Sequence, residues 1–272
     1  MEGLVMDLFK QLPTKVEDVT IGADPEVFLI DKDKNIVPAC GLIGGNKEKP
    51  RIVVDGNLQE DNIMGEFGVD PSLTREGFVR RINSVFTQLQ NATKYDLLVK
   101  ASANIPKSVL DATPESKVFG CDPDFNAYTI IQNPTPDAES TLRTCAGHLH
   151  MGFVMSVPER ERSHLGAYVV KYCDAVLGLW SLLVDPDVRR RTRYGKAGAY
   201  RPKPYGIEYR VPSNFWLNSD SLKAEVFDRM KLAYDMARNG VELPSADIER
   251  IINTSDTEAA VGVMGELSCL NV

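Results

Sequence analysis

Short segments in which apolar and polar residues alternate recur along the chain, and this period-two pattern is typical of half-buried β-strands. The first, TIGADPEVFLID at residues 20–31, ends at a Lys-Asp-Lys-Asn turn and is followed by IVPAC, so we predict a hairpin there. Similar segments predict the remaining strands, two of them within 51–71 and one each in 97–103, 127–132, 145–154 and 205–211.

Apolar residues at helical spacing predict three long helices between and after these strands. One begins near Ser72, a second opens at Pro158, which is a favoured first helical residue, and a third runs from a Ser219 cap to Gly240. An amphipathic segment at residues 4–12 and short helical pieces near the C-terminus complete the pattern. Because strands and helices arrive in mixed order, we expect an α+β fold with a largely antiparallel sheet.

Composition narrows the class of protein. The chain has 272 residues, 43% of them hydrophobic, which is enough to bury one large core without disulfides, so we predict a single domain over residues 1–272. The candidate motifs lie in 21–216, and 218–272 is expected to be helical. With 31 basic and 38 acidic residues the net charge is −7, which argues against sequence-independent nucleic-acid binding.

Location is predicted from the cysteines and from the apolar runs. Five cysteines without a CxxC pair fit reduced thiols in a cytoplasm rather than a disulfide framework. We find no apolar run as long as the ~18 residues of a membrane span. The N-terminus lacks the layout of a signal peptide. We therefore expect a cytoplasmic protein with no membrane partner.

Charged and imidazole side chains share one face of several predicted strands, where a core strand would carry apolar residues. The evenly spaced pairs are Asp24 with Glu26, His148 with His150, Glu208 with Arg210 and, if one strand is continuous, Glu60 with Glu66. A solvated outer face is the plain alternative. However, the chain has three histidines and two of them form one such pair, and the acidic pairs interrupt otherwise apolar segments. We therefore interpret this face as a site.

Carboxylates in this number suit hard cations. Mg²⁺ takes oxygen ligands, usually one or two carboxylates per ion, and leaves places for water and phosphate oxygens. We expect four or five carboxylates with one imidazole to hold two or three Mg²⁺ or Mn²⁺ ions, whereas zinc prefers more histidine and cysteine. A metal-dependent amidohydrolase would need further histidines, and only His164 remains.

Two loops carry weaker signals. GLIGGNK at residues 41–47 is only loosely like a phosphate loop, because it lacks the GxxxxGK[ST] spacing. In a chain of charge −7, the basic run from Arg189 to Lys203 is expected to face a local anion, such as nucleotide phosphates or a substrate carboxylate. No local signature supports a Ser-His-Asp or Cys-His nucleophile.

Several blocks, in the same order along the chain, resemble one enzyme superfamily. GADPEVFLID resembles the strand that opens the catalytic domain of glutamine synthetases, and glutamate–cysteine ligases share its acid-x-glutamate pair. GHLHMG and YGIEYRV resemble the His-x-His and Glu-x-Arg strands of that superfamily. Other stretches are similar to its phage-type carboxylate–amine ligases (amidoligases): GLIGGNKEKP, FGCDPDFNAYT, RTCAGHLHMGF and RRTRYGKAGAYRPKPYGIEYRVPSNFW. These blocks cover most of the chain from Ile21 to Trp216.

The resemblance implies a curved sheet with helices packed on its convex face and a concave face that forms a funnel for metal-bound ATP. It assigns six metal ligands, which are Asp24, Glu26, Glu60, Glu66, His148 and Glu208. Glu60 is preferred to Asp61 in this set, although Glu60 and Glu66 are closer together in sequence than the corresponding acidic pair of glutamine synthetases. Asp24 stands where glutamate is usual.

The resemblance also implies contacts to nucleotide and substrate. His150 matches the histidine that lies against the nucleotide, and Arg201 and Arg210 match basic groups that meet the γ-phosphate and the acyl phosphate. From their places in the phage-type blocks we expect phosphate or substrate contacts for three more residues: Lys47 and Arg191 at the nucleotide, and Asn126, with Arg210, at the substrate.

These roles imply an ATP-dependent carboxylate–amine ligase. ATP would convert a carboxylate into an acyl phosphate, and an amine of a small molecule or peptide would attack it to give an amide, ADP and phosphate. The amine must lose a proton, and Asp61 or another loop carboxylate is expected to accept it. The resemblance places the protein in the cytoplasm of a phage-infected bacterium, as a homo-oligomer or part of a phage assembly. The alternative is a virion-associated structural or assembly subunit that retains the ligase fold.

Overall fold

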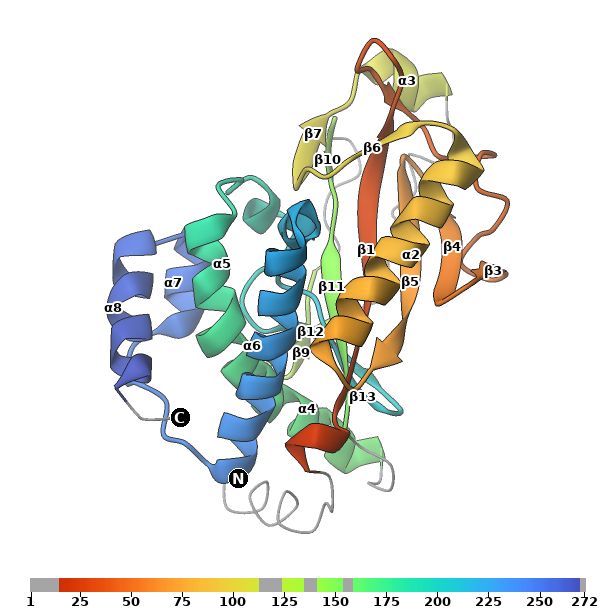
Figure 1. Cartoon of the computed structure of the whole chain (residues 1–272). Helices are drawn as coiled ribbons and strands as arrows, with labels where there is room; N and C mark the ends of the chain where they lie inside the picture. Colours follow the sequence, from red (N-terminus) through yellow and green to blue (C-terminus); the bar gives the residue numbers. More distant parts are fainter. Residues whose placement is uncertain (1–14, 113–123, 135–140, 154–158, 270–272) are drawn as a thin grey trace.

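A large antiparallel sheet forms the centre of the protein (Figure 1). The computed structural model describes residues 15–112, 124–134, 141–153 and 159–269. Its eleven-stranded sheet has the order β3-β4-β5-β1-β11-β13-β12-β8-β9, and β2 and β6 also pair with β1. The described strands are β1 (Thr20–Ile30), β2 (Ile36–Val37), β3 (Arg51–Val53), β4 (Gly56–Asp61), β5 (Met64–Ser72), β6 (Asp96–Leu98), β7 (Ser102–Asn104), β8 (Phe125–Asn126), β9 (Ile131–Gln132), β10 (Leu142–Thr144), β11 (Gly147–Gly152), β12 (Ala199–Lys203) and β13 (Gly206–Tyr209).

Helices cover one face of this sheet, and the predicted α+β class with a curved antiparallel sheet is confirmed. In Figure 1, α2 and α6 lie side by side against the sheet, while α7 and α8 lie outside α5. The described helices are η1 (Val16–Asp18), α2 (Arg75–Thr93), α3 (Lys107–Ala112), α4 (Glu159–Cys173), the π-helical turn η3 (Asp174–Gly178), α5 (Leu179–Val184), η4 (Arg190–Thr192), η5 (Asn214–Asn218), α6 (Asp220–Asn239), α7 (Ile248–Thr254) and α8 (Thr257–Ser268).

The period-two alternation of the strands separates a core face from a polar face. Val27, Leu149 and Tyr209 are fully buried in the main core, together with the apolar stripe of α2 that includes Phe78 and Ile82. The residues between them along the strands therefore point to the opposite face of the sheet. This is the face that carries the acidic and imidazole pairs.

The helix formed by α4, η3 and α5 is unusually apolar. Its segment Glu161–Val184 has a mean hydropathy of 1.4 over its most apolar window, so by length and composition alone it could cross a membrane. Lys171 and Asp174 lie within this segment, so its uninterrupted apolar runs are shorter than a membrane span, as expected from the sequence. In the folded chain 78% of that window is buried, as in the core helix of a globular protein.

Three strand predictions need correction because turns interrupt them. Residues 51–71 form three strands rather than two, since Asp55 and Asn62 adopt left-handed turn conformations (φ 67° and 54°). The segment 97–103 divides into parts of β6 and β7, and 127–132 is mostly a turn. That turn follows Asn126, whose Oδ1 accepts hydrogen bonds from the N–H groups of the second and third residues after it, at 2.7 and 3.1 Å.

The predicted start and end of α6 are confirmed, whereas the helix expected near Ser72 begins at Arg75 with a Thr74 cap, because Ser72 still belongs to β5. Ser219 caps α6 by accepting a hydrogen bond from the Leu222 N–H, and Gly240 ends the helix with φ 62°. The predicted helix start at Pro158 and the amphipathic segment 4–12 lie outside the described residues.

Gly147 is expected to be irreplaceable because it lets β11 approach η5 closely. A Cβ at this position would clash with the Ser213 carbonyl oxygen and with the indole nitrogen of Trp216. We expect Gly147→Ala to lower the free energy of unfolding by about 2 kcal/mol or more. The control Gly262→Ala, in α8 with no atom near its Cβ, should raise it by about 0.5–1 kcal/mol. Chemical denaturation checks both, and equal stability of the two variants would contradict this role.

Candidate functional site: two acidic clusters beside an arginine-lined cavity

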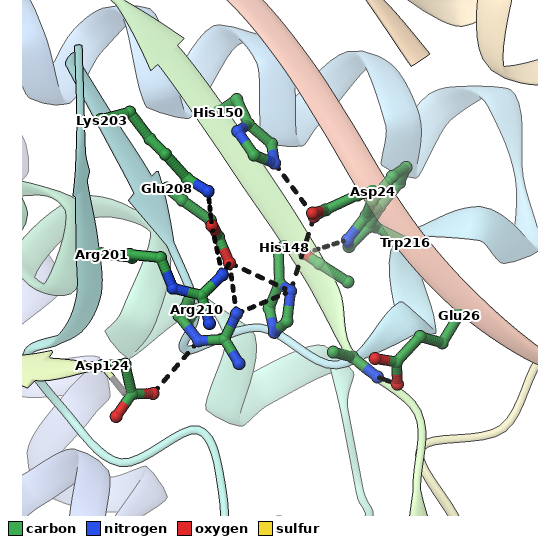
Figure 2. Close-up of polar contacts among 12 residues, drawn as sticks. Asp24, Glu26, Asp124, His148, His150, Arg201, Lys203, Glu208, Arg210 and Trp216 are labelled. Carbon is green, nitrogen blue, oxygen red and sulfur yellow. Dashed lines mark hydrogen bonds and ion pairs between the residues drawn. The ribbon is translucent and has the colours of Figure 1, made fainter. Parts of the chain in front are cut away.

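The pairing of four neighbouring strands brings together side chains that are distant in sequence. Asp24 of β1 lies opposite His148 of β11, and His150 lies opposite Glu208 of β13. On the other side of β1, Glu26 lies opposite Glu66 of β5. Each of these residues lies on the polar face, so the sheet gathers them into one region, and Figure 2 shows all of them except Glu66.

Glu26, Asp61 and Glu66 form a first group, which we call the carboxylate cluster. One carboxylate oxygen from each residue lies within 4.8 Å of the others. Glu26 is buried, and its Oε2 accepts a hydrogen bond of 2.7 Å from the Ala146 N–H, which fixes its position. Asp61 ends β4, and the β4–β5 hairpin places it beside Glu66.

Burial and mutual repulsion shift the pKa values of this cluster upwards. Burial and then the charge of Asp61 raise the pKa of Glu26 to about 8. Burial, followed by the charges of Asp24, Asp61 and Glu26, raises the pKa of Glu66 well above its ordinary value. The pKa of Asp61 is also raised by burial, although the charges of nearby basic side chains oppose the shift. Three carboxylates in this state require protons or a cation.

Asp24, His148, His150 and Glu208 form a second group, which we call the imidazole cluster. Asp24 Oδ1 lies 3.1 Å from His150 Nε2 and 3.5 Å from His148 Nδ1, and His148 Nδ1 lies 3.6 Å from Glu208 Oε1. The ligand atoms of Asp24, His150 and Glu208 also fall within 4.8 Å of one another. His150 Nδ1 forms a further hydrogen bond of 2.6 Å with the Tyr205 hydroxyl.

The pKa values of the two histidines are shifted in opposite directions. Burial and the charge of Arg210 lower the pKa of His148 to about 4, so its ring is neutral at physiological pH. Burial also opposes the charged form of His150, but the charges of Asp24 and Glu208 outweigh it and raise the pKa of His150. A neutral imidazole is the form that binds metals, whereas a protonated one attracts anions. The neutral His148 therefore suits a metal ion, and the upward shift of the His150 pKa favours contact with an anion.

Glu208 is held by basic residues as well as by the histidines. Arg201 Nη1 and Lys203 Nζ lie 2.9 and 2.7 Å from Glu208 Oε2, and Arg210 contacts Oε1. Burial and the charge of Asp24 would raise the pKa of Glu208, but the charges of Arg210 and the two histidines lower it to about 2. Glu208 is therefore ionised at any physiological pH.

A cavity opens next to both clusters. It encloses about 720 Å³, counting the space at its mouth, and Glu26, Asp61, His148 and Arg210 form part of its wall. Its other described walls include residues that sequence reasoning missed: Asp124, Arg143, Arg190, Arg193 and Tyr194. The basic run from Arg189 to Lys203 indicated Arg190 and Arg193 only as members of a group. Nothing in the local sequence distinguishes Arg143 from an ordinary surface arginine.

Three residues expected at the site lie elsewhere. The Glu60 carboxylate accepts hydrogen bonds from the N–H groups of Gly41, Ile43 and Gly44, so it anchors the glycine-rich loop. Arg191 donates to Ser181 Oγ at 3.0 Å behind the cavity, and its neighbour Arg190 faces the cavity instead. Asn126 builds its own turn and donates to Glu249 Oε1 of α7 at 3.0 Å.

The other expected residues lie in or near the two clusters. Asp61 occupies the position in the carboxylate cluster that was expected for Glu60, because the phase of β4 turns it, and not Glu60, toward Glu66. Lys47 is exposed, and its charge lowers the pKa of Asp61, which places it near that cluster.

Comparison with known families gives a match over the segment that carries part of the site. Residues 141–253 match the family described as "Phage phiEco32-like COOH.NH2 ligase-type 2". The matched segment contains β11, β12 and β13, and with them both histidines, Glu208, Arg201 and Arg210. The match supports a carboxylate–amine ligase family. No curated protein matches the chain.

The raised pKa of Glu26 predicts how stability depends on pH. A carboxyl that binds its proton more tightly in the folded state makes folding less favourable as pH rises, by up to about 1.4 kcal/mol per pH unit for one proton. Without divalent ions, we expect the free energy of unfolding to fall between about pH 5 and pH 8, and Glu26→Gln to flatten this slope.

Divalent cations bind carboxylates in their ionised form, so added Mg²⁺ is expected to stabilise the wild type more at the upper end of this range. Denaturant titration at several pH values measures both effects. The exposed Glu76→Gln variant is the matched control and should keep the wild-type slope. An unchanged slope in Glu26→Gln would show that Glu26 ionises normally.

Proposed function

We propose that this protein is an ATP- and Mg²⁺-dependent carboxylate–amine ligase that joins an acid to an amine and releases ADP and phosphate. The observation that carries this proposal is the strand register that sets two acidic clusters against Arg201, Arg210 and a cavity. Phosphoryl transfer needs positioning and strong stabilisation of negative charge, and cations and arginines on one surface supply both. The match to a ligase family supports the same reaction.

The donor sets fit divalent cations. Glu26 and Glu66 would hold one ion at the carboxylate cluster, with Asp61 beside them. Asp24 and Glu208, with His148 Nδ1 at 3.5 and 3.6 Å from them, would hold a second. Oxygen donors with at most one imidazole suit Mg²⁺ or Mn²⁺. When bound, the ions would neutralise phosphate charge. Burial and the charges of neighbouring carboxylates raise the pKa values of Glu26 and Glu66, and a bound cation would counteract this repulsion.

The arginines are suited to the first half of the reaction. A carboxylate is a poor electrophile, so the γ-phosphate of ATP is transferred to it and an acyl phosphate forms. Arg210 lies between Glu208, Asp124 and His148, and it lines the cavity, so it can contact a phosphoryl group that is transferred there. His150, at the open end of the imidazole cluster, is placed to contact the nucleotide phosphates.

Asp61 is the best-placed proton acceptor for the second half. The attacking amine must lose a proton as it forms the amide bond, and a base is most effective when its pKa is near the working pH. Asp61 lines the cavity, and burial raises its pKa. Because Mg²⁺ usually takes only one or two carboxylates, Glu26 and Glu66 can hold an ion while Asp61 accepts the proton.

Binding of a nucleotide tests this function without knowledge of the substrates. With Mg²⁺ and a non-hydrolysable ATP analogue at a hundred times its dissociation constant, we expect about 2.7 kcal/mol of added stability, a rise of several degrees in Tm. The rise should require Mg²⁺, disappear in Glu26→Gln and His148→Ala, and persist in the control Glu76→Gln.

ADP release with mixtures of acids and amines should be lost in the same two variants. If the wild type shows no Mg²⁺-dependent shift at millimolar nucleotide, the ligase proposal fails, and the structural-subunit alternative is favoured.

A further inference from the structure

The glycine-rich loop at residues 41–47 is attached to the sheet by one carboxylate. The N–H of Gly41 donates to Glu60 Oε2 at 2.9 Å, and the N–H groups of Ile43 and Gly44 donate to Oε1 at 3.1 Å. Gly41 and Gly44 have left-handed backbones (φ 77° and 78°), a conformation that glycine adopts without strain. A concave set of backbone N–H groups binds an anion, and in this loop that anion is the Glu60 side chain.

This occupied site changes what the loop can offer to a ligand. A phosphate loop directs its backbone N–H groups at a nucleotide. Here the three N–H groups are used within the chain, on Glu60. The group that the loop brings to the site is therefore a side chain, the ammonium of Lys47.

Further contacts fix the distance between the loop and the carboxylate cluster. The Glu60 N–H donates to the Gly45 carbonyl at 2.8 Å, so Gly45 lies beside the residue that precedes Asp61. A Cβ on Gly45 would clash with backbone atoms of β3 and β4, so only glycine allows this approach. Lys47 is two residues farther along the chain, and two residues span at most about 7 Å. Its long side chain can therefore reach Asp61.

The electrostatics of Asp61 agree with this position. Burial raises the pKa of Asp61, and the charge of Lys47 is the strongest influence that opposes the shift. Asp61 lines the cavity, so Lys47 lies at its edge. An ammonium group has three donors, so Lys47 can contact Asp61 and a phosphate oxygen at the same time. Because Lys47 is exposed, its position depends on how firmly the loop is held.

We propose that Glu60 is a positioning residue: by filling the anion-binding turn of the glycine-rich loop, it holds Lys47 where the ammonium group contacts a phosphate of the bound nucleotide. For the identity of that phosphate as part of ATP, this inference rests on the proposed ligase function. It predicts that Glu60 and Lys47 act as a unit, although only Lys47 touches the ligand.

Calorimetric titration of the full chain with inorganic pyrophosphate and Mg²⁺ tests this unit. We expect Lys47→Gln to weaken pyrophosphate binding about tenfold, the effect of one charge-assisted contact. Glu60→Ala should weaken it by a similar factor, and the double variant should lose no more than either single variant, because both residues serve one contact. The exposed Lys49→Gln and Glu48→Ala, in the same loop, are the matched controls and should keep the wild-type affinity.

Added acetate separates positioning from a general loss of structure. Acetate can bind the three N–H groups that Glu60→Ala exposes, so it should restore pyrophosphate affinity in this variant but not in Lys47→Gln. Acetamide, its neutral analogue, should restore neither, and the wild type titrated in acetate is the control. If Glu60→Ala does not fold, Glu60→Gln keeps the test valid, since it retains one acceptor oxygen and should bind pyrophosphate with intermediate affinity.

Four results would overturn the inference: additive losses in the double variant, wild-type affinity in Glu60→Ala, no recovery in acetate, or no pyrophosphate binding by the wild type at millimolar concentration. Because no nucleotide is present, these results separate from the nucleotide test. A Mg²⁺-dependent nucleotide shift without coupling between Glu60 and Lys47 removes only this inference, whereas coupling without a nucleotide shift removes only the ligase function.

Discussion

The buried carboxylate of Glu208 is the constraint on which the rest of the site depends. Its side chain has no exposed surface, and the burial of an unpaired carboxylate costs on the order of several kcal/mol. Arg201, Lys203 and Arg210 offset this cost, and all three come from the β12–β13 hairpin or the residue that follows it. The hairpin must therefore keep its register for the charges to balance. The same register sets Glu208 opposite His150 and so closes the imidazole cluster.

The opposite face of this hairpin depends on a second buried carboxylate. Asp174 accepts hydrogen bonds from the Tyr209 hydroxyl at 2.6 Å, the Gly198 N–H at 2.6 Å and the Tyr128 hydroxyl at 3.0 Å. It begins the π-helical turn between α4 and α5, and such turns often occur next to functional sites. Tyr209 lies between Glu208 and Arg210 in the chain, so the contact behind the sheet fixes the strand that presents the charges in front. The hydrogen bonds between the helix layer and the sheet therefore help to position the charged residues of the site.

Patterns within a strand predicted the directions of its side chains, whereas the turns between elements decided which of two adjacent residues reaches the site. The faces of Asp24, Glu26, His148 and His150 were predicted from period-two alternation, which is a local property of an extended backbone. The prediction that Glu60, rather than Asp61, shares a face with Glu66 was wrong. The left-handed Asn62 reverses the chain between β4 and β5, and this turn puts Asp61 on the Glu66 face. In the same way, the basic run was recognised as a group, but the short turn η4 decides that Arg190 rather than Arg191 faces the cavity.

The sequence by itself determined the α+β class, the caps of α6 and the polar face of each strand, because these depend on residues within a few positions of one another. The tertiary structure alone decided which strands are neighbours, and therefore which carboxylates share a cation site and repel one another. It also decided that Arg143 and Arg193, about fifty positions apart in the chain, both line one cavity. The physical reason is that side-chain direction follows from local backbone geometry, whereas the distance between two charges depends on register, loops and the packing of the whole core.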